Sequence, residues 1–179
     1  MKDVSREYRE MEIPENIQVR IEDDRVITKG KQGELVRVFS HPGVKIEMKD
    51  GKIFVRPTGN KKENIALAGT YRAHLRNMMK GVDEKFTYHM KTVYAHFPVK
   101  MGVKGNKVVI SNFLGERSDR HAKILDGIEV KISKDEITIS GMNIEKVGQT
   151  CANIERATKV KKKDKRVFQD GAYLVKRIR

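Results

Sequence analysis

Apolar and polar residues alternate along much of the first half of the chain. One polar residue separates Val19 from Ile21, and Val26 and Thr28 resume the alternation after the acidic stretch Glu22–Asp24. A period of two is typical of strands with one buried face, and clustered acids favour a turn between strands. Further strands are predicted by the same rule at residues 34–39, 44–48 and 53–55. The first half therefore begins as a meander of short strands.

A helix is predicted after these strands. Asn60 and Glu63 have the spacing of a capping box, in which each side chain satisfies a backbone N–H of the other residue. Beyond them, apolar residues recur three and four positions apart, as on one face of a helix. They are Ala68, Tyr71, Leu75 and Met78. Gly81 is predicted to end the helix, because glycine is common just beyond a helix C-terminus.

The second half of the chain repeats this order of elements. Matched positions are Val26 with Val108, Ile53 with Ile137, and Leu75 with Ile154, at offsets of 82, 84 and 79 residues. The second helix is predicted to be capped near Asn143 and to reach Thr158. A near-constant offset across strands and helix indicates an internal duplication. We therefore predict an α+β fold of two tandem duplicated domains, each an antiparallel sheet with one packed helix.

The duplication divides the chain into four segments. Residues 1–12 have no apolar period and are interpreted as a flexible leader, followed by a first α+β domain at residues 13–82. A second α+β domain is predicted at residues 83–160, and residues 161–179 form a basic C-terminal extension attached to it. The alternation from Tyr88 to His96 predicts that the connection is a strand of the second sheet.

Composition indicates the class of partner. The 179 residues carry 38 Lys or Arg against 24 Asp or Glu, a formal net charge of +14, and the isoelectric point is near 9.9. Such an excess favours a polyanion, with nucleic acid ahead of an anionic membrane surface. No apolar run approaches the roughly 20 residues that span a bilayer, and the N-terminus lacks a signal-peptide core. We expect a soluble, cytoplasmic protein.

No catalytic residue, cofactor site or metal site is predicted. The histidines are scattered, without the spacing of metal ligands. They are His41, His74, His89, His96 and His121. No phosphate-binding or dinucleotide-binding glycine motif follows a predicted strand. The single Cys151 can form no internal disulfide, which fits a reducing cytosol, and it lies on the apolar stripe of the second helix. We therefore expect a buried, unreactive thiol.

Over half of the excess charge lies between Arg156 and Arg179. This segment holds ten Lys or Arg against Asp164 and Asp170, which is +8 of the chain's +14. A solvated charge run is the simpler interpretation of any one lysine cluster. Cations interleaved with aromatics favour RNA, because they neutralise phosphates while the rings stack on bases. The predicted RNA contacts are Lys159, Lys161, Lys162, Lys163, Lys165, Arg166, Lys176, Arg177 and Arg179, with Arg117, Arg120 and Lys123 as a second group.

The aromatics of this segment have two interpretations. Asp170 and Gly171 are predicted to form a turn that pairs Val167–Phe168 with Tyr173–Val175 in a small hairpin. Phe168 and Tyr173 then either pack in the second core, worth roughly 1.5–3 kcal/mol each, or stack on bases, worth roughly 1–3 kcal/mol each. The neighbouring aliphatic residues favour packing, but these magnitudes do not decide between the two.

Two Gly-x-x-Gly stretches suggest an alternative function. Gly30–Gly33 and Gly102–Gly105 resemble the loop with which K-homology domains clamp a nucleic-acid backbone. That loop joins two helices, whereas both stretches here are flanked by strand-like sequence, which favours plain hairpin turns. A K-homology-like regulator that binds single-stranded RNA is therefore the second hypothesis. A third, an RNA-modifying enzyme, has no acid or histidine to nominate as its catalytic group.

The C-terminal residues also carry a family resemblance. The pattern Lys163-x-x-Arg166-x-Phe168-x-Asp170-Gly171-x-Tyr173 resembles the C-terminal signature of the L-six family of large-subunit ribosomal proteins, in its archaeal and eukaryotic form. Ile13–Val19 and the pattern Val26-x-x-x-Gly30-x-x-Gly33-Glu34-Leu35 are similar to that family's opening, and Asn112–Glu116 to the start of its second domain. Three positions depart from the family pattern without removing a cation, namely Lys31, Arg156 and Ala172.

The resemblance implies a place of action that the residues alone do not. It implies a structural protein of the cytoplasmic ribosome whose C-terminal domain binds 23S-type ribosomal RNA near the sarcin–ricin loop. Translational GTPases would dock nearby, and other large-subunit proteins would be partners. Within this resemblance, Phe168, Asp170, Gly171 and Tyr173 form a structural motif. No cofactor and no membrane contact are implied.

Overall fold

A computed structural model describes residues 10–95, 97–164 and 166–178. Residues 1–9 of the expected leader, and His96, lie outside the described residues. The chain forms two compact units, unit 1 at Met1–Glu84 and unit 2 at Lys85–Arg179. Each has its own hydrophobic core, and the buried residues of the two cores do not overlap. The tandem duplicated α+β fold is thereby confirmed.

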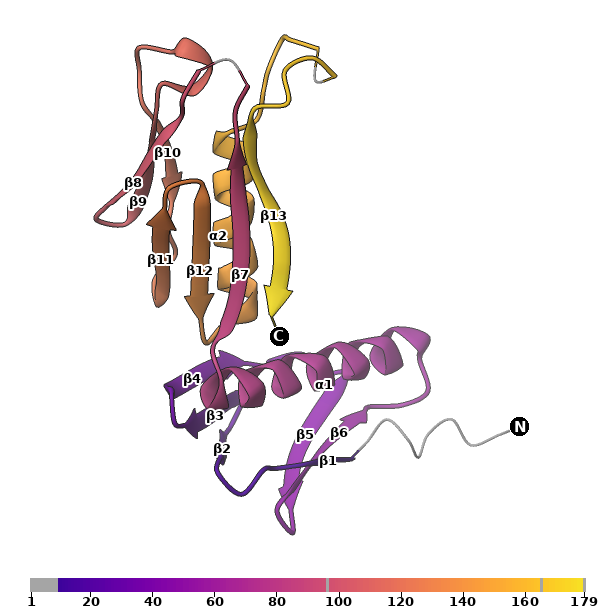
Figure 1. The fold of residues 1–179 in the computed structure, drawn as a ribbon. Helices are drawn as coiled ribbons and strands as arrows, with labels where there is room; N and C mark the ends of the chain where they lie inside the picture. The colour runs from indigo at the N-terminus through magenta and orange to yellow at the C-terminus, as the bar shows by residue number, and fades with distance from the viewer. Residues whose placement is uncertain (1–9, 96, 165, 179) are drawn as a thin grey trace. The chain divides into compact units, whose positions relative to one another are not determined.

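Unit 1 contains six strands and one helix (Figure 1). The elements are β1 Glu10–Glu12, β2 Gln18–Glu22, β3 Arg25–Gly30, β4 Gly33–Val38, β5 Val44–Lys49, β6 Lys52–Pro57 and α1 Lys62–Asp83. The strands pair antiparallel in two sheets, with orders β1-β6-β5 and β2-β3-β4. Helix α1 contacts both sheets. The predicted alternation is confirmed, because Val26 and Thr28 are fully buried and Val19 nearly so.

Three local predictions in unit 1 are wrong. Residues 10–12 are not leader but strand β1, which pairs with β6 and buries Met11. Three residues are too few to show a period of two. The helix begins at Lys62, after Lys61 rather than after Asn60, and it continues through Gly81 to Asp83. Gly81 is buried in the last turn of α1 and does not end the helix.

The Gly30–Gly33 turn packs against the end of α1. A Cβ atom on Gly30 would lie 2.6 Å from the carbonyl oxygen of Val82, and the N–H of Gln32 donates to that same oxygen at 2.8 Å. Glycine is therefore required by close approach of strand and helix. The second stretch lies in strand β8 and its turn. Both stretches are hairpins, so neither has the helix–loop–helix setting of a K-homology loop.

Unit 2 repeats this plan and adds a strand. The elements are β7 Phe86–Val93, β8 Lys100–Lys104, β9 Lys107–Ser111, the 3₁₀ turn η1 Phe113–Gly115, β10 Arg120–Lys123, β11 Ile128–Ser133, β12 Glu136–Gly141, α2 Ile144–Ala157 and β13 Gly171–Ile178. The sheet orders are β10-β9-β8 and β11-β12-β7-β13. The side chain of Asn143 accepts hydrogen bonds from two backbone N–H groups and caps α2, as predicted. Strand β7 is the predicted connection into the second sheet.

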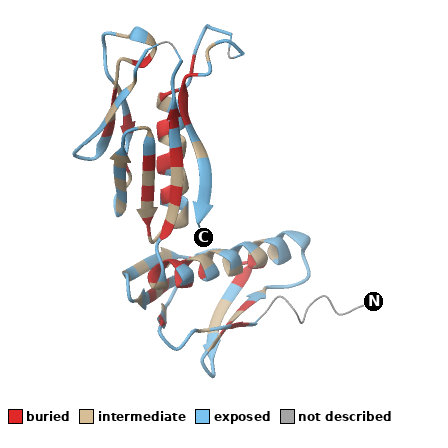
Figure 2. Cartoon of the chain, viewed as in Figure 1, coloured by how far each residue is buried: buried red, intermediate tan, exposed pale blue. Residues whose placement is uncertain are grey.

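Equivalent elements place equivalent residues in the two cores. The matched pairs Val26 and Val108, Ile53 and Ile137, and Leu75 and Ile154 are all 0–1% exposed. Strands β2–β4 correspond to β8–β10, and β1, β5 and β6 to β7, β11 and β12. Figure 2 shows buried positions recurring along β12, β7 and α2. Strand β13 alone has no equivalent among the described residues of unit 1.

Strand β13 overturns the predicted hairpin at the C-terminal end. Residues 171–178 pair antiparallel with β7, from Gly171 opposite Val93 to Ile178 opposite Thr87, with an irregularity between Leu174 and Lys176. Val167–Phe168 is only two residues long and could form few backbone hydrogen bonds with residues 171–178, whereas β7 offers a long open edge. The expected extension at 161–179 is thus a loop followed by a strand of the second sheet.

Candidate RNA interface

Half of the predicted RNA contacts belong to the segment between α2 and β13. This segment, residues 158–170, is here called the basic loop. Lys159, Lys161, Lys162, Lys163 and Arg166 are all exposed on it. Lys165 and Arg179 lie outside the described residues. The structure therefore gathers cations from five positions of one loop at the surface of unit 2.

Buried polar groups hold both ends of the basic loop. At its start, the hydroxyl of Thr158 donates to the carbonyl of Ile154 and accepts from the N–H of Ala172 at 3.0 Å. At its end, the carboxylate of Asp170 accepts from the N–H of Ala95 at 3.1 Å. Thr158 and Asp170 are 2% and 1% exposed. Hydrogen bonds made in such a dry setting are costly to lose, so the ends of the loop are fixed.

The two aromatics of the segment have different environments. Phe168 is half-buried and packs against the core of unit 2, and the ammonium of Lys163 lies 4.3 Å from the centre of its ring. Tyr173 is 49% exposed, and its hydroxyl donates to the carbonyl of Gln169 at 3.0 Å. Packing in the core therefore describes Phe168 but not Tyr173.

One cation of the basic loop is paired within the protein. The guanidinium of Arg166 donates to both carboxylate oxygens of Asp164, at 3.2 and 3.1 Å. Hydrogen bonds from the side chain and backbone of Arg166 lower the pKa of Asp164 below its ordinary value. The pair is exposed, so an incoming phosphate can compete with the carboxylate for the guanidinium.

Arg120 has a structural role that the sequence did not indicate. Its guanidinium forms a bidentate pair with Glu116, at 2.7 and 2.5 Å, and donates to the carbonyls of Ala157 and Lys159. It also lies 4.4 Å from the centre of the Phe113 ring. These partners use the donors that a phosphate would need. Arg117 and Lys123, the other two members of the second group, are exposed.

The charges around Glu116 show which loops meet. The hydrogen bond from Arg120 is the main cause of a lowered pKa at Glu116, and the charges of Lys161 and Lys163 lower it further. The basic loop and the η1 segment are therefore neighbours. Exposed cations from both, including Arg117, belong to one surface of unit 2.

Two exposed aromatics near this surface were not predicted as RNA contacts from the sequence. Tyr94 and Phe97 are 41% and 45% exposed. The ring of Phe97 lies 3.2 Å from the position of a Cβ on Gly115, whose φ is +75°, and the side-chain N–H of Asn112 donates to the carbonyl of Pro98. Tyr94 was expected in the alternating strand, but β7 ends at Val93, so both rings lie in the loop that follows it.

Strand β13 supplies a second set of cations. Lys176 and Arg177 are exposed, and Lys176 is paired in register with His89 of β7. The guanidinium carbon of Arg177 lies 5.7 Å from the centre of the Tyr88 ring. Both residues are fixed by the ladder with β7. They are not on a mobile arm.

The described part of the chain holds no group of three or more residues arranged to bind a metal ion. Cys151 is buried, and burial raises the pKa of its thiol to about 12, in agreement with the expected unreactive thiol. None of the described helices is long and apolar enough to cross a membrane.

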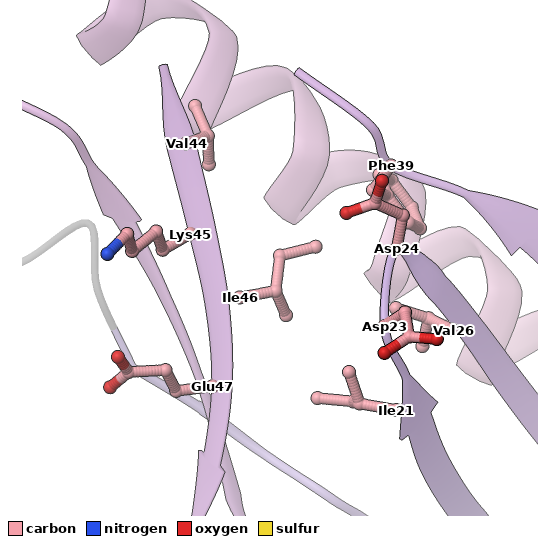
Figure 3. Close-up of a pocket in the computed structure, with 9 residues that line it drawn as sticks. All are labelled: Ile21, Asp23, Asp24, Val26, Phe39, Val44, Lys45, Ile46 and Glu47. Atoms are coloured by element: carbon pink, nitrogen blue, oxygen red, sulfur yellow. The ribbon is translucent and has the colours of Figure 1, made fainter. Parts of the chain in front are cut away.

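Unit 1 has a hollow of about 290 Å³ between its sheets (Figure 3). Its lining is acidic, in contrast to the cationic surface of unit 2. Ile21 and Ile46 point into it from opposite sides, and Asp23, Asp24 and Glu47 line it. Carboxylates outnumber the one cation, Lys45. The hollow therefore does not suit a polyanion.

Comparison with known proteins agrees with the division of the chain into two similar units. The family model described as Ribosomal protein L6 matches residues 13–85 and again 97–171, once in each unit. A protein of Methanococcus vannielii named large ribosomal subunit protein uL6 is 48% identical over 168 residues, covering 94% of this chain and 92% of its own. Proteins of the same name from Archaeoglobus fulgidus and Methanothrix thermoacetophila are 48% and 47% identical, covering 96% and 94% of this chain and 90% and 96% of their own. The chain therefore belongs to the ribosomal protein L6 family.

Proposed function

We propose that this protein is a structural constituent of the large subunit of the cytoplasmic ribosome and that unit 2 binds 23S-type ribosomal RNA through its phosphates. The observation that carries the proposal is the set of exposed cations on β13 and on the basic loop, whose two ends are held by buried hydrogen bonds. The proposed contacts on these two elements are Lys159, Lys161, Lys162, Lys163, Arg166, Lys176 and Arg177, with Arg117 and Lys123 from the rest of unit 2. Lys165 and Arg179 lie outside the described residues and are proposed from the sequence alone. Arg120 is left out because its donors are used within the protein.

Family membership and electrostatics support the same partner. The relatives are named for the large ribosomal subunit, and the net charge of +14 suits an RNA polyanion. Fixed cations contact phosphates without first losing the conformational freedom of a disordered arm. Backbone contacts hold RNA segments in place and carry no sequence information of their own.

The location on the subunit follows from the family resemblance. We propose that unit 2 lies near the sarcin–ricin loop, close to where translational GTPases dock, with other large-subunit proteins as neighbours. Protection of RNA nucleotides from hydroxyl radicals in reconstituted subunits tests this location. Protection elsewhere in the RNA, with the sarcin–ricin region unaffected, would contradict it.

Salt dependence tests the phosphate contacts. If about six to ten cations contact phosphates, the affinity for protein-free large-subunit RNA falls by about 10³–10⁵ between roughly 50 and 200 mM salt. Replacing Lys161, Lys162 and Lys163 together by Gln removes up to three contacts. The slope of log affinity against log salt then becomes less steep by about 2–3.

A matched variant in unit 1 provides the control. Lys45, Lys49 and Lys61 are exposed, and their replacement by Gln removes the same charge from the other unit. This variant is expected to keep the salt slope of the unchanged protein within about one. An equal loss in both variants would show that only net charge matters. Truncation after Arg156 is a poor test, because it also removes β13 from the sheet.

A further inference from the structure

We propose that Tyr173 is a stacking site for one unpaired base of the bound RNA, on the sheet face that α2 leaves uncovered. This inference rests on the proposed RNA binding and adds the kind of nucleotide that unit 2 recognises. Phosphate contacts alone bind paired and unpaired RNA alike, whereas a ring that stacks on a base distinguishes them.

The ring of Tyr173 is held in place before any ligand arrives. Its hydroxyl donates to the carbonyl of Gln169 at 3.0 Å, which fixes one end. Ring atoms lie 3.1–3.2 Å from the position that a Cβ on Gly171 would occupy, so the ring lies over Gly171. One side of the ring is thus covered by backbone, yet 49% of the residue remains exposed. A ring fixed in this way loses little conformational freedom when it stacks.

The pairing register places this ring among cations. Tyr88 and Met90 of β7 are buried on the side of α2, so Lys91 and His89 lie on the opposite face. Tyr173 is paired with Lys91, and Lys176 with His89. Directly paired residues share a face of the sheet. The ring therefore has an exposed lysine opposite it and another further along its own strand.

One carboxylate reaches β13 from α2: Glu155 accepts from the N–H of Leu174 at 3.2 Å and lines a hollow of about 270 Å³ together with Tyr173. The acidic side chains on the open face belong to β11 and β12, on the other side of β7 from β13. Glu129 of β11 is paired with Lys131 at 3.1 Å, and Glu136 of β12 is opposite Lys91 on the far side of β7. In Figure 1 the sheet lies in front of α2, and β13 forms its outer edge. A strand of RNA can follow the β7–β13 side with phosphates near Lys91 and Lys176 and a base on Tyr173.

Base stacking on an antiparallel sheet is a known mode of RNA recognition. RNA-recognition motifs use aromatics on a four-stranded sheet for this purpose, and they bind single strands. Loss of one stacked base lowers affinity by roughly 5- to 150-fold. A base inside a duplex has no free face, so Tyr173 selects an unpaired nucleotide.

Substitution of the full chain tests the stack. Tyr173→Leu is expected to weaken binding to protein-free large-subunit RNA by roughly 5- to 150-fold. The slope against salt should stay unchanged because no cation is removed. Tyr173→Phe keeps the ring and loses only its hydroxyl, so its affinity should stay within about threefold. Phe54→Leu, which changes a half-buried aromatic of unit 1, is the control and should bind normally.

The outcomes separate this inference from the proposed function. If the unchanged protein fails to bind the RNA, the proposed function falls. If it binds and Tyr173→Leu binds equally well, only the stacking site falls. Slow labelling of Cys151 in the Leu variant, equal to that of the unchanged protein, shows that unit 2 is still folded. Should the variant be unfolded, the comparison rests on Tyr173→Trp instead.

Tyr173→Trp is a reporter because the natural chain has no tryptophan. The indole ring remains able to stack, and stacking on a base quenches its fluorescence. A 12-nucleotide oligouridylate is expected to quench the emission, and a 12-base-pair RNA duplex to leave it nearly unchanged at equal occupancy. Equal quenching by both, or no quenching by bound oligouridylate, overturns the proposal.

Discussion

At Arg120 a single guanidinium joins three segments of unit 2. It binds the carboxylate of Glu116 beside η1, and it donates to the carbonyls of Ala157 and Lys159 at the end of α2. Only 22% of its side chain is exposed, so these hydrogen bonds are partly protected from water. The arrangement connects the start of the basic loop to the body of the unit.

Replacing Arg120 by Lys is expected to destabilise unit 2 by about 1–3 kcal/mol. Lysine cannot reproduce a bidentate pair together with two carbonyl contacts, and charge-assisted hydrogen bonds contribute at this level. The measurement is the urea concentration at which Cys151, the only cysteine, becomes reactive toward a thiol reagent. Arg117→Lys changes an exposed neighbour and should shift stability by less than about 0.5 kcal/mol. Equal effects at both positions would argue against the role assigned to Arg120.

Glu116 makes the stability of unit 2 depend on acid. Its pKa is lowered in the folded state, so its contribution is present above its ordinary pKa near 4.5 and is lost as the pH falls through the folded value. The protein should therefore lose more stability between pH 6 and pH 3 than Glu116→Gln does. Urea unfolding followed by circular dichroism at both pH values measures this difference. A Gln variant with the same acid loss would falsify the assignment.

At the scale of elements, the two helices carry glycines at equivalent positions. Gly69 lies in α1 and Gly148 in α2, and a Cβ on either would meet nothing within 4 Å. Neither position requires a left-handed backbone. Glycine at these two positions therefore lowers the stability of each helix, and no packing contact in this structure requires it.

Gly69→Ala and Gly148→Ala should each stabilise their own unit by about 0.5–1 kcal/mol. Hydrogen exchange of the backbone amides, resolved by unit, measures the change at each site. Gly30→Ala is the contrasting variant, because its Cβ would lie 2.6 Å from the Val82 carbonyl oxygen and must destabilise unit 1. Stabilisation by all three, or by none, would contradict this account.

Strands and helices were predictable to different degrees from their residues. The alternation at Val26 and the stripe through Leu75 are local signals, and both elements formed as expected. The partner of residues 171–178 could not be predicted, because it depends on which sheet edge is open far away in the sequence. The cap at Asn60 failed for a local reason. Asn64 donates to the carbonyl of Thr58 and arranges that entry in another way.

The candidate site was predictable in composition but not in geometry. The charge of the lysine cluster is enough to predict a polyanionic partner; the cluster is Lys161, Lys162 and Lys163. That Arg120 is used internally depends on the fold, which brings the end of α2 and the η1 segment beside it. That Tyr173 lies over Gly171 depends on the course of β13. Charge is a property of the sequence, whereas the availability of a side chain is a property of the fold.

At the scale of the whole molecule, the separate cores predict independent folding. The buried residues of unit 1 end at Val82 and those of unit 2 begin at Phe86. Fragments 1–84 and 85–179 should each unfold cooperatively in urea. The second fragment should keep RNA affinity within about tenfold of the full chain. A non-cooperative fragment, or RNA affinity carried by residues 1–84, would refute the division of roles.

The strand that completes the sheet of unit 2 has a consequence for biosynthesis. Strand β7 emerges before β8 to α2 have been made, and its edge stays open until residues 171–178 follow. A nascent protein can therefore finish unit 1 first, while unit 2 still lacks its edge strand. Until that strand pairs, the N–H of Ala172 cannot reach Thr158, and the lysines before it have no fixed positions. The RNA-binding surface of unit 2 is therefore completed late in synthesis, after most of the chain has been made.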